Sequence, residues 1–200
     1  MTATVFVVED HPGLRDALAR LLETAGLKTA VYADGNTFLA ACDQESSGCV
    51  LLDIAMPVMS GTEIQAALNE RGIPIPVIFL TGHGDITMAV RALQCGAVDF
   101  LEKPIQGDVL LERVRRALAI DEEYRRKQAF VRDVQRRYAR LSLREREVMA
   151  LVVSGQSNKE IARLLALSPR TVEVHRTHVM NKMEAANLVE LVNMNAHCQP

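Results

Sequence analysis

The chain has 200 residues, of which 48% are hydrophobic and 24% are charged, and its formal net charge is −2. This length and composition predict one or two globular domains with enough apolar side chains for packed cores. No run approaches the ~20 consecutive apolar residues of a membrane span, and no basic segment typical of a secretory signal precedes the first strand-like run. The four cysteines lack CxxC or metal-ligand spacing, which indicates reduced thiols and predicts a cytoplasmic protein with no membrane partner.

Charge is distributed unevenly along the chain. Residues 1–118 hold 9 basic and 15 acidic side chains, residues 119–139 hold 6 and 4, and residues 140–200 hold 8 and 6. An acidic first region suits the binding of a cation, and a mildly basic last region suits the approach to a polyanion. Ordinary variation of surface charge is the alternative explanation.

Strand-like and helix-like segments alternate through the first ~120 residues. The strand-like runs are Thr4–Val8, Lys28–Tyr32, Cys49–Leu52, Pro76–Leu80 and Asp99–Glu102. The helix-like segments are 14–25, 36–41, 62–69, 85–94 and 108–119. This alternation predicts an α/β fold in which a doubly wound sheet of five parallel strands has helices on both faces.

The rest of the chain is predicted to be helical. Residues 110–138 contain neither proline nor glycine, so the last helix of the first region is expected to continue into a helical linker. The charged runs at 121–123 and 125–127 are expected to be solvated helix faces with i,i+4 pairs. The apolar stripe of Phe130, Val134 and Tyr138 either mediates dimerisation or packs on the neighbouring domain. These patterns predict a first domain at residues 1–119, a linker at 120–139 and a small all-α domain at 140–200.

Reactive polar side chains follow several of the predicted strands. Glu9 and Asp10 follow the first, Asp53 the third, Thr81 the fourth and Lys103 the fifth. Because ligands of open α/β sheets bind outside the carboxyl ends of the strands, these side chains are expected to meet at one edge. Crowded carboxylates suit Mg²⁺ (or Mn²⁺), and an aspartate beside the cation can act as a nucleophile toward phosphorus. A hydroxyl and an ammonium suit the phosphoryl oxygens.

Four short segments carry these residues: Glu9-Asp10, the run from Asp53 to Gly61, the run from Thr81 to Asp85, and the run from Phe100 to Pro104. Together they resemble the receiver domain of bacterial two-component response regulators, and specifically the FixJ-type subclass. The resemblance covers roughly residues 4–120. It implies a flavodoxin-like sheet of strand order 2-1-3-4-5 and phosphorylation by a sensor histidine kinase.

The resemblance also implies roles for single residues in the pocket. Asp53 would accept the phosphoryl group, and Glu9, Asp10, Asp53 and the carbonyl of Ala55 would ligate the cation. Glu9 departs from the pattern, because many relatives carry aspartate there. A glutamate keeps the charge but lengthens the arm, which puts the strength of metal binding in question.

A second set of residues would report phosphorylation to the rest of the chain. The resemblance implies that Lys103 pairs with the phosphoryl group and is followed by a cis bond to Pro104, and that Thr81 and Phe100 are coupled switch residues. The surface formed by residues 87–93 and 98–101 would then change shape and form a homodimer.

In the tail, the third predicted helix, which Ser168 is expected to cap ahead of Pro169, has one apolar face formed by Val172, Val179 and Met183. A helix of this kind behind a tight turn is typical of the recognition element of a helix-turn-helix, which fits the DNA major groove. Candidate base contacts on the opposite arc are Arg170, Glu173, Val174, Thr177, His178 and Asn181. Candidate phosphate contacts are Asn158, Lys159, Thr171, His175 and Lys182. Arg176 falls nearer the apolar face and is left out.

Three segments of the tail, at 141–148, 155–162 and 168–176, resemble the LuxR/NarL-type DNA-binding domain and also region 4 of sigma factors. A small helical bundle whose stripe merely packs is the plainer alternative. With the receiver resemblance, the tail predicts a transcription regulator that is not an enzyme, with double-stranded DNA and RNA polymerase as partners.

Two other functions are weighed against this one. The first region could be a constitutive protein-interaction module attached to a DNA-binding domain. Alternatively, it could be a phosphatase that uses two aspartates two positions apart. Ala55 stands at the second of those positions and offers no carboxylate as general acid, which argues against the phosphatase.

Overall fold

The computed structural model describes residues 3–82 and 96–198. The chain divides into two compact units, Met1–Arg125 and Arg126–Pro200. The helix predicted at 85–94 and the switch surface predicted at 87–93 lie outside the described residues. Among the helices of the described ranges, none is long and apolar enough to cross a membrane.

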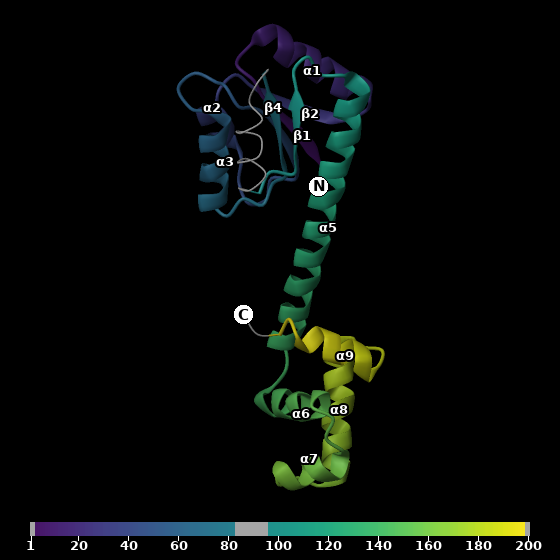
Figure 1. Ribbon diagram of the computed structural model, residues 1–200. Helices are drawn as coiled ribbons and strands as arrows, with labels where there is room; N and C mark the ends of the chain where they lie inside the picture. Colours follow the sequence, from purple (N-terminus) through teal and green to yellow (C-terminus); the bar gives the residue numbers. More distant parts are fainter. Residues whose placement is uncertain (1–2, 83–95, 199–200) are drawn as a thin grey trace. The chain divides into compact units, whose positions relative to one another are not determined.

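The first unit is built on a parallel sheet (Figure 1), whose five strands have the order β2-β1-β3-β4-β5. The strands are β1 (Thr4–Val8), β2 (Lys28–Tyr32), β3 (Gly48–Asp53), β4 (Val77–Thr81) and β5 (Asp99–Glu102). Val8 lies opposite Leu52, Asp53 opposite Leu80, and Thr81 opposite Glu102. The predicted fold class and strand order are confirmed, and the carboxyl ends of these strands lie along one edge.

Helices cover both faces of this sheet (Figure 1). On one face lie α1 (Pro12–Thr24) and the first part of α5 (Gly107–Ala139), and on the other lie α2 (Gly35–Ala41) and α3 (Gly61–Glu70). Successive side chains of a strand point to opposite faces, so Val7 packs with α1 and α5 whereas Val8 packs with α2 and α3. The three central strands β1, β3 and β4 are buried throughout and largely apolar, because both of their faces are covered, whereas the edge strands β2 and β5 are partly exposed.

Helix α5 runs without interruption from Gly107 to Ala139, which confirms that the last helix of the first region continues beyond residue 119. The prediction of a solvated charged face was wrong for Asp121, which is 2% exposed. Its carboxylate accepts hydrogen bonds from the backbone N–H of Gly48 at 2.8 Å and the hydroxyl of Ser47 at 3.0 Å. The expected i,i+4 partner, Arg125, lies 2.9 Å away. The backbone N–H at the start of β3 needs an acceptor, and Asp121 supplies it.

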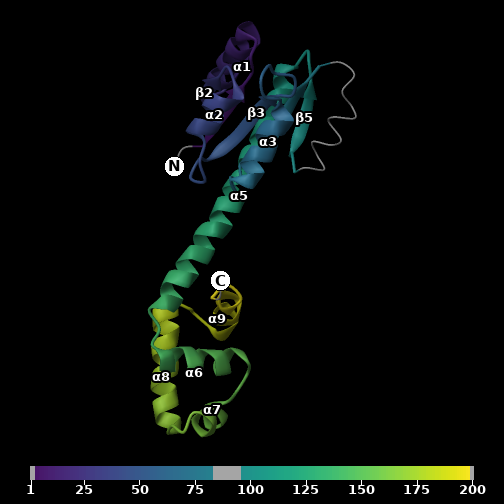
Figure 2. The same cartoon turned by 90° about the vertical axis from the view of Figure 1, so that its left-hand side faces the viewer.

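The second unit contains α6 (Leu143–Val153), α7 (Asn158–Leu164), α8 (Pro169–Met183) and α9 (Leu188–Asn195). Ser142 and Ser157 form capping boxes at the starts of α6 and α7, and Ser168 caps α8 ahead of Pro169 as the sequence predicts. Helix α8 packs against both α6 and α7 (Figure 2).

The predicted apolar face of α8 is buried in the core of this unit, through Val172, Val179 and Met183. Val134 of α5 lies in the same core, so the stripe of α5 packs there at that position. Phe130 is 46% exposed, with its ring edge against His197.

Candidate functional site

Three acidic side chains meet at the carboxyl edge of the sheet. Glu9, Asp10 and Asp53 each offer a carboxylate oxygen, and these oxygens all lie within 4.8 Å of one another. Glu9 and Asp53 are 1% and 5% exposed. Buried carboxylates at this spacing repel one another strongly, and a hard divalent cation with oxygen ligands removes that repulsion. The donor set therefore fits Mg²⁺ or Mn²⁺.

Lys103 joins two of these carboxylates. Its Nζ lies 2.8 Å from Glu9 Oε2 and 2.9 Å from Asp53 Oδ2. Burial alone lowers the pKa of Lys103, but its hydrogen bonds to Glu9 and Asp53 outweigh that effect and leave the pKa raised. The ammonium is therefore held charged beside Asp53, and the longer arm of Glu9 reaches it directly. The peptide bond from Lys103 to Pro104 is cis, as expected.

Of the other residues expected at this edge, Ala55 contacts Asp53 directly. The backbone N–H of Ala55 donates to Asp53 Oδ1 at 3.3 Å. Thr81 is 4% exposed, and its hydroxyl donates to the carbonyl oxygen of Gly82 at 3.1 Å. Phe100 is 39% exposed and lies within the edge strand β5. A hydroxyl bonded to an adjacent carbonyl can exchange that bond for a stronger charge-assisted one to a phosphoryl oxygen.

Two further residues, Arg15 and His11, support the pocket. Arg15 Nη1 donates to the carbonyl oxygens of Glu9 at 2.8 Å and Asp10 at 3.2 Å, which holds the loop carrying both carboxylates. His11 caps α1, because its Nδ1 accepts a hydrogen bond from the backbone N–H of Leu14. The backbone N–H of His11 donates to Glu9 Oε1. The only sequence signal for Arg15 is a basic residue in the first turn of a helix that follows an acidic pair.

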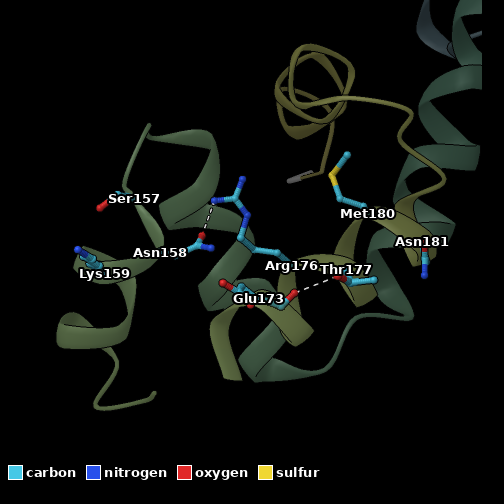
Figure 3. A pocket seen from close by; sticks show the side chains of 8 residues that line it. All are labelled: Ser157, Asn158, Lys159, Glu173, Arg176, Thr177, Met180 and Asn181. Carbon is cyan, nitrogen blue, oxygen red and sulfur yellow. Dashed lines mark hydrogen bonds between the residues drawn. The ribbon is translucent and has the colours of Figure 1, made fainter. Parts of the chain in front are cut away.

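A hollow of about 840 Å³ opens between α7 and α8 in the second unit (Figure 3). Its lining residues are Ser157, Asn158, Lys159, Glu173, Arg176, Thr177, Met180 and Asn181. The structure thus brings together five of the predicted DNA contacts, from two helices. Arg176, which the helical projection had set aside, is part of it and donates to Asn158 Oδ1 at 2.7 Å. A projection of one helix cannot reveal this residue's role, because its partner lies on another helix.

The remaining predicted DNA contacts lie in different surroundings. Arg170 and Val174 are exposed on α8, whereas Thr171 is held near the N-cap by a hydroxyl contact with Ser168. His175 is half-buried, and its Nδ1 has no hydrogen-bond partner among the described residues.

The last two predicted contacts, Lys182 and His178, face a buried carboxylate. Lys182 Nζ lies 2.7 Å from Glu145 Oε2, and His178 Nδ1 lies 3.8 Å from Glu145 Oε1. Burial raises the pKa of Glu145, but hydrogen bonds from Lys182 and Ser142 outweigh burial and lower the pKa to about 2. Lys182 therefore joins α8 to α6.

Comparison with known proteins adds two family matches. Residues 5–115 match the response regulator receiver domain, and residues 139–195 match the bacterial regulatory proteins of the luxR family. The chain is 42% identical to the transcriptional regulatory protein FixJ of Bradyrhizobium diazoefficiens, over 95% of this chain and 93% of that protein. It is 37% identical to the response regulator protein TodT of Pseudomonas putida, over 96% and 85%.

Two solved structures extend the similarity to the fold. The response regulator StyR has a TM-score of 0.90 at 37% identity, covering 98% of this chain and 99% of that one. Full-length FixJ from B. japonicum has a TM-score of 0.62 at 40% identity, covering 99% and 98%.

Proposed function

Because the chain belongs to the FixJ-type two-component response regulators, we propose that phosphorylation of Asp53 by a sensor histidine kinase switches its dimerisation and its sequence-specific binding to DNA. As a member of this family it is a transcription regulator and not an enzyme. We place the receiver domain at residues 1–119, the helical linker at 120–139 and the DNA-binding domain at 140–200, and we expect the protein to act in the cytoplasm. The observation that carries the proposal is the convergence of Glu9, Asp10 and Asp53 on one another, with Lys103 beside them.

Phosphoryl transfer assigns a task to each group in the pocket. An oxygen of Asp53 attacks phosphorus, the new O–P bond forms, and the N–P bond of the donor's phosphohistidine breaks. Glu9, Asp10, Asp53 and the carbonyl of Ala55 would hold the divalent cation, which neutralises charge on the transferred group. Lys103 already contacts Asp53 and stabilises the phosphoryl oxygens as a point charge.

The same transfer would start the conformational change. A phosphoryl group on Asp53 offers the Thr81 hydroxyl a charged acceptor in place of the Gly82 carbonyl. Thr81 then moves toward the pocket, and the half-exposed Phe100 takes the space that it leaves. A change from mostly inactive to mostly active requires a differential of about 5.5 kcal/mol between the two states. We assign the resulting dimer contact to the surface around residues 87–93 and 98–101.

In the second unit, we assign DNA recognition to α8 and the adjacent start of α7. The hollow between them presents Asn158, Lys159 and Asn181, and Val174 is 43% exposed on α8. Val174 suits contact with a thymine methyl, and Glu173 suits the amino group of cytosine. A dimer would place two copies of α8 on half-sites about one helical turn apart, and we expect the bound regulator to contact RNA polymerase.

The decisive experiment compares the native chain with Asp53→Asn, with and without acetyl phosphate and Mg²⁺. We expect the native chain to take up one phosphoryl group, to dimerise in sizing experiments and to bind its operator more tightly in gel shifts. The variant should do none of these in response to the donor. DNA binding of the native chain that does not change with the donor would instead favour a constitutive interaction module.

The same gel shifts test the DNA surface. Affinity should fall steeply between 50 mM and 200 mM salt, because contacts to phosphate dominate such complexes. A flat salt response would contradict the assignment of α8.

A further inference from the structure

The loop that follows the phosphoacceptor holds an apolar side chain in a strained and open position. Val58 is 94% exposed, and its φ is +72°. The backbone N–H of Met59 donates to the carbonyl oxygen of Pro57 at 2.8 Å, so these residues form a γ-turn centred on Val58. A γ-turn with positive φ at its centre is the strained form, and a β-branched residue is poorly suited to it. Folding alone would be better served by glycine or asparagine at this position.

Both ends of this loop, residues 54–60, lie next to the phosphoacceptor Asp53. The loop leaves β3 directly after Asp53 and returns to it, because the N–H of Gly61 donates to the carbonyl oxygen of Ile54 at 3.0 Å. A Cβ on Gly61 would lie only 2.4 Å from the carbonyl oxygen of Asp53. Val58 is three residues from Gly61, and at 3.80 Å for each Cα step it cannot lie further than about 15 Å from Asp53. Since the loop begins and ends at the carboxyl edge of the sheet, where the three carboxylates meet, this distance limit places Val58 near the rim of the pocket.

This position lies within the area that a protein phosphodonor must cover. The Asp53 side chain is only 6% exposed, so a donor residue has to enter the pocket while the surface around it rests on the rim. A standard protein interface covers about 800 Å² on each partner, which equals a disc about 16 Å in radius. A disc of that size centred on Asp53 includes Val58. A small phosphodonor such as acetyl phosphate enters the pocket without covering the rim.

We propose that Val58 is an apolar specificity contact for the domain of the partner kinase that carries the phosphohistidine. This inference rests on the proposed phosphorylation of Asp53 and adds the surface by which the donor is selected. An apolar patch on the kinase domain covers the valine during transfer, and removal of its side chain from water contributes to the affinity. The exposed valine does not alter the chemistry of Asp53, because it contributes only to the encounter with a protein.

The test uses the full chain and four variants. Val58→Thr keeps the β-branched shape and the backbone strain but replaces a methyl by a hydroxyl group. Val58→Asn suits a positive φ and keeps the loop folded if threonine disturbs it, whereas Val58→Ile retains the apolar surface. Val189→Thr makes the same chemical change at a valine that is 70% exposed on α9.

Each protein is phosphorylated in two ways. One donor is acetyl phosphate with Mg²⁺. The other is the autophosphorylated core of a sensor histidine kinase, chosen by screening the kinases of the host genome for the fastest transfer to the native chain.

We expect Val58→Thr and Val58→Asn to slow transfer from the kinase about tenfold at subsaturating concentration, the factor set by one valine side chain that is no longer buried. Labelling by acetyl phosphate should stay within twofold of the native rate. Val58→Ile should restore transfer from the kinase, and Val189→Thr should leave both reactions unchanged.

Other outcomes reject the inference. Equal kinase transfer in all variants would remove Val58 from the donor contact. A parallel loss with acetyl phosphate would mean that the loop acts on the reactivity of Asp53. Intact transfer with weaker dimerisation would assign the valine to a second copy of the chain. Failure of both donors to label Asp53 in the native chain would reject the proposed function and this inference with it.

Discussion

Two groups of charged side chains, one in each compact unit and each built around at least one buried carboxylate, differ in how their charges are compensated. In the first unit, Asp53 shares the ammonium of Lys103 with Glu9 while Asp10 lies close by, so the described residues leave a surplus of negative charge. In the second unit, Glu145 Oε2 lies 2.7 Å from Lys182 Nζ, and the same carboxylate accepts a hydrogen bond from the backbone N–H of Ser142.

This difference distinguishes a site whose charges suit a bound cation, in the first unit, from an ion pair that joins two helices, in the second. A buried carboxylate with a full set of partners is stable in its charged form, which is why the pKa of Glu145 falls to about 2 although burial by itself raises it. Crowded carboxylates without enough cationic partners weaken the fold and bind a cation instead. Surplus charge therefore marks the functional pocket, and balanced charge marks the structural contact.

The largest expected effect is on the rate of Asp53 phosphorylation, and it is found by replacing the lysine of each group with methionine. Lys103→Met removes a charge that stabilises the transferred phosphoryl group, so labelling of Asp53 by acetyl phosphate should slow about 10²-fold. Lys182→Met should leave that rate within twofold. Intact-protein mass spectrometry over time measures both, and an equal loss in the two variants would contradict the comparison.

Removal of the structural carboxylate should weaken the second unit. Glu145→Gln loses charged hydrogen bonds to Lys182 and Ser142, which is expected to lower the free energy of unfolding of this unit by about 2 kcal/mol. Hydrogen exchange of the amides in α6 and α8 measures the change. Glu173→Gln is the matched control, because its pair with Arg170 is exposed and should contribute less than about 0.5 kcal/mol. Similar losses in the two variants would show that the buried pair of Glu145 contributes no more to stability than the exposed pair of Glu173.

Acid should remove the contribution of Glu145 in a defined range. Its pKa is about 2 in the folded chain against an ordinary 4.5, so its charged form stabilises the fold above pH 4.5, and this contribution is lost as the pH falls toward 2. Hydrogen exchange of the amides in α6 and α8, measured between pH 4.5 and pH 2, should show that the free energy of unfolding falls in the native chain and stays more nearly constant in Glu145→Gln. The same dependence in that variant would assign the acid sensitivity to other carboxylates.

The smallest effect should be a gain. Asp10→Asn removes one of the three crowded negative charges and keeps the size of the side chain. Because the repulsion from Glu9 and Asp53 is then smaller, the first unit should be stabilised by about 1 kcal/mol in the absence of divalent ions. Mg²⁺ should raise the melting temperature of the native chain and change that of the variant much less. Calorimetry with and without Mg²⁺ tests this, and destabilisation by Asp10→Asn without the ion would show that the charges are already compensated.

The elements and their order were largely predictable from the sequence, because they depend on local signals. Strand-like runs of four or five residues that alternate with helix-like segments predict a parallel sheet, and Ser142, Ser157 and Ser168 mark helix starts by capping. The convergence of Glu9, Asp53 and Lys103 followed as well, because all strands of a parallel sheet end at the same edge.

Partners far apart in the chain were not predictable. Asp121 was expected in water, yet it binds the start of β3, 73 residues away. Arg176 was set aside because of its angle on α8, yet it bonds to Asn158 on α7. A capping box identifies Glu145 as the third residue of its helix, but nothing in that motif indicates that Lys182 completes its environment.

The sequence by itself determined the α/β and helical regions, the positions of the helix caps and the group of residues at the carboxyl edge of the sheet. Only the tertiary structure decided which charged side chains are compensated and which are left in surplus, and that Val58 lies open beside the pocket. The physical reason is range. Backbone periodicity and capping act over a few residues, whereas burial and ion pairing depend on where distant segments come to lie.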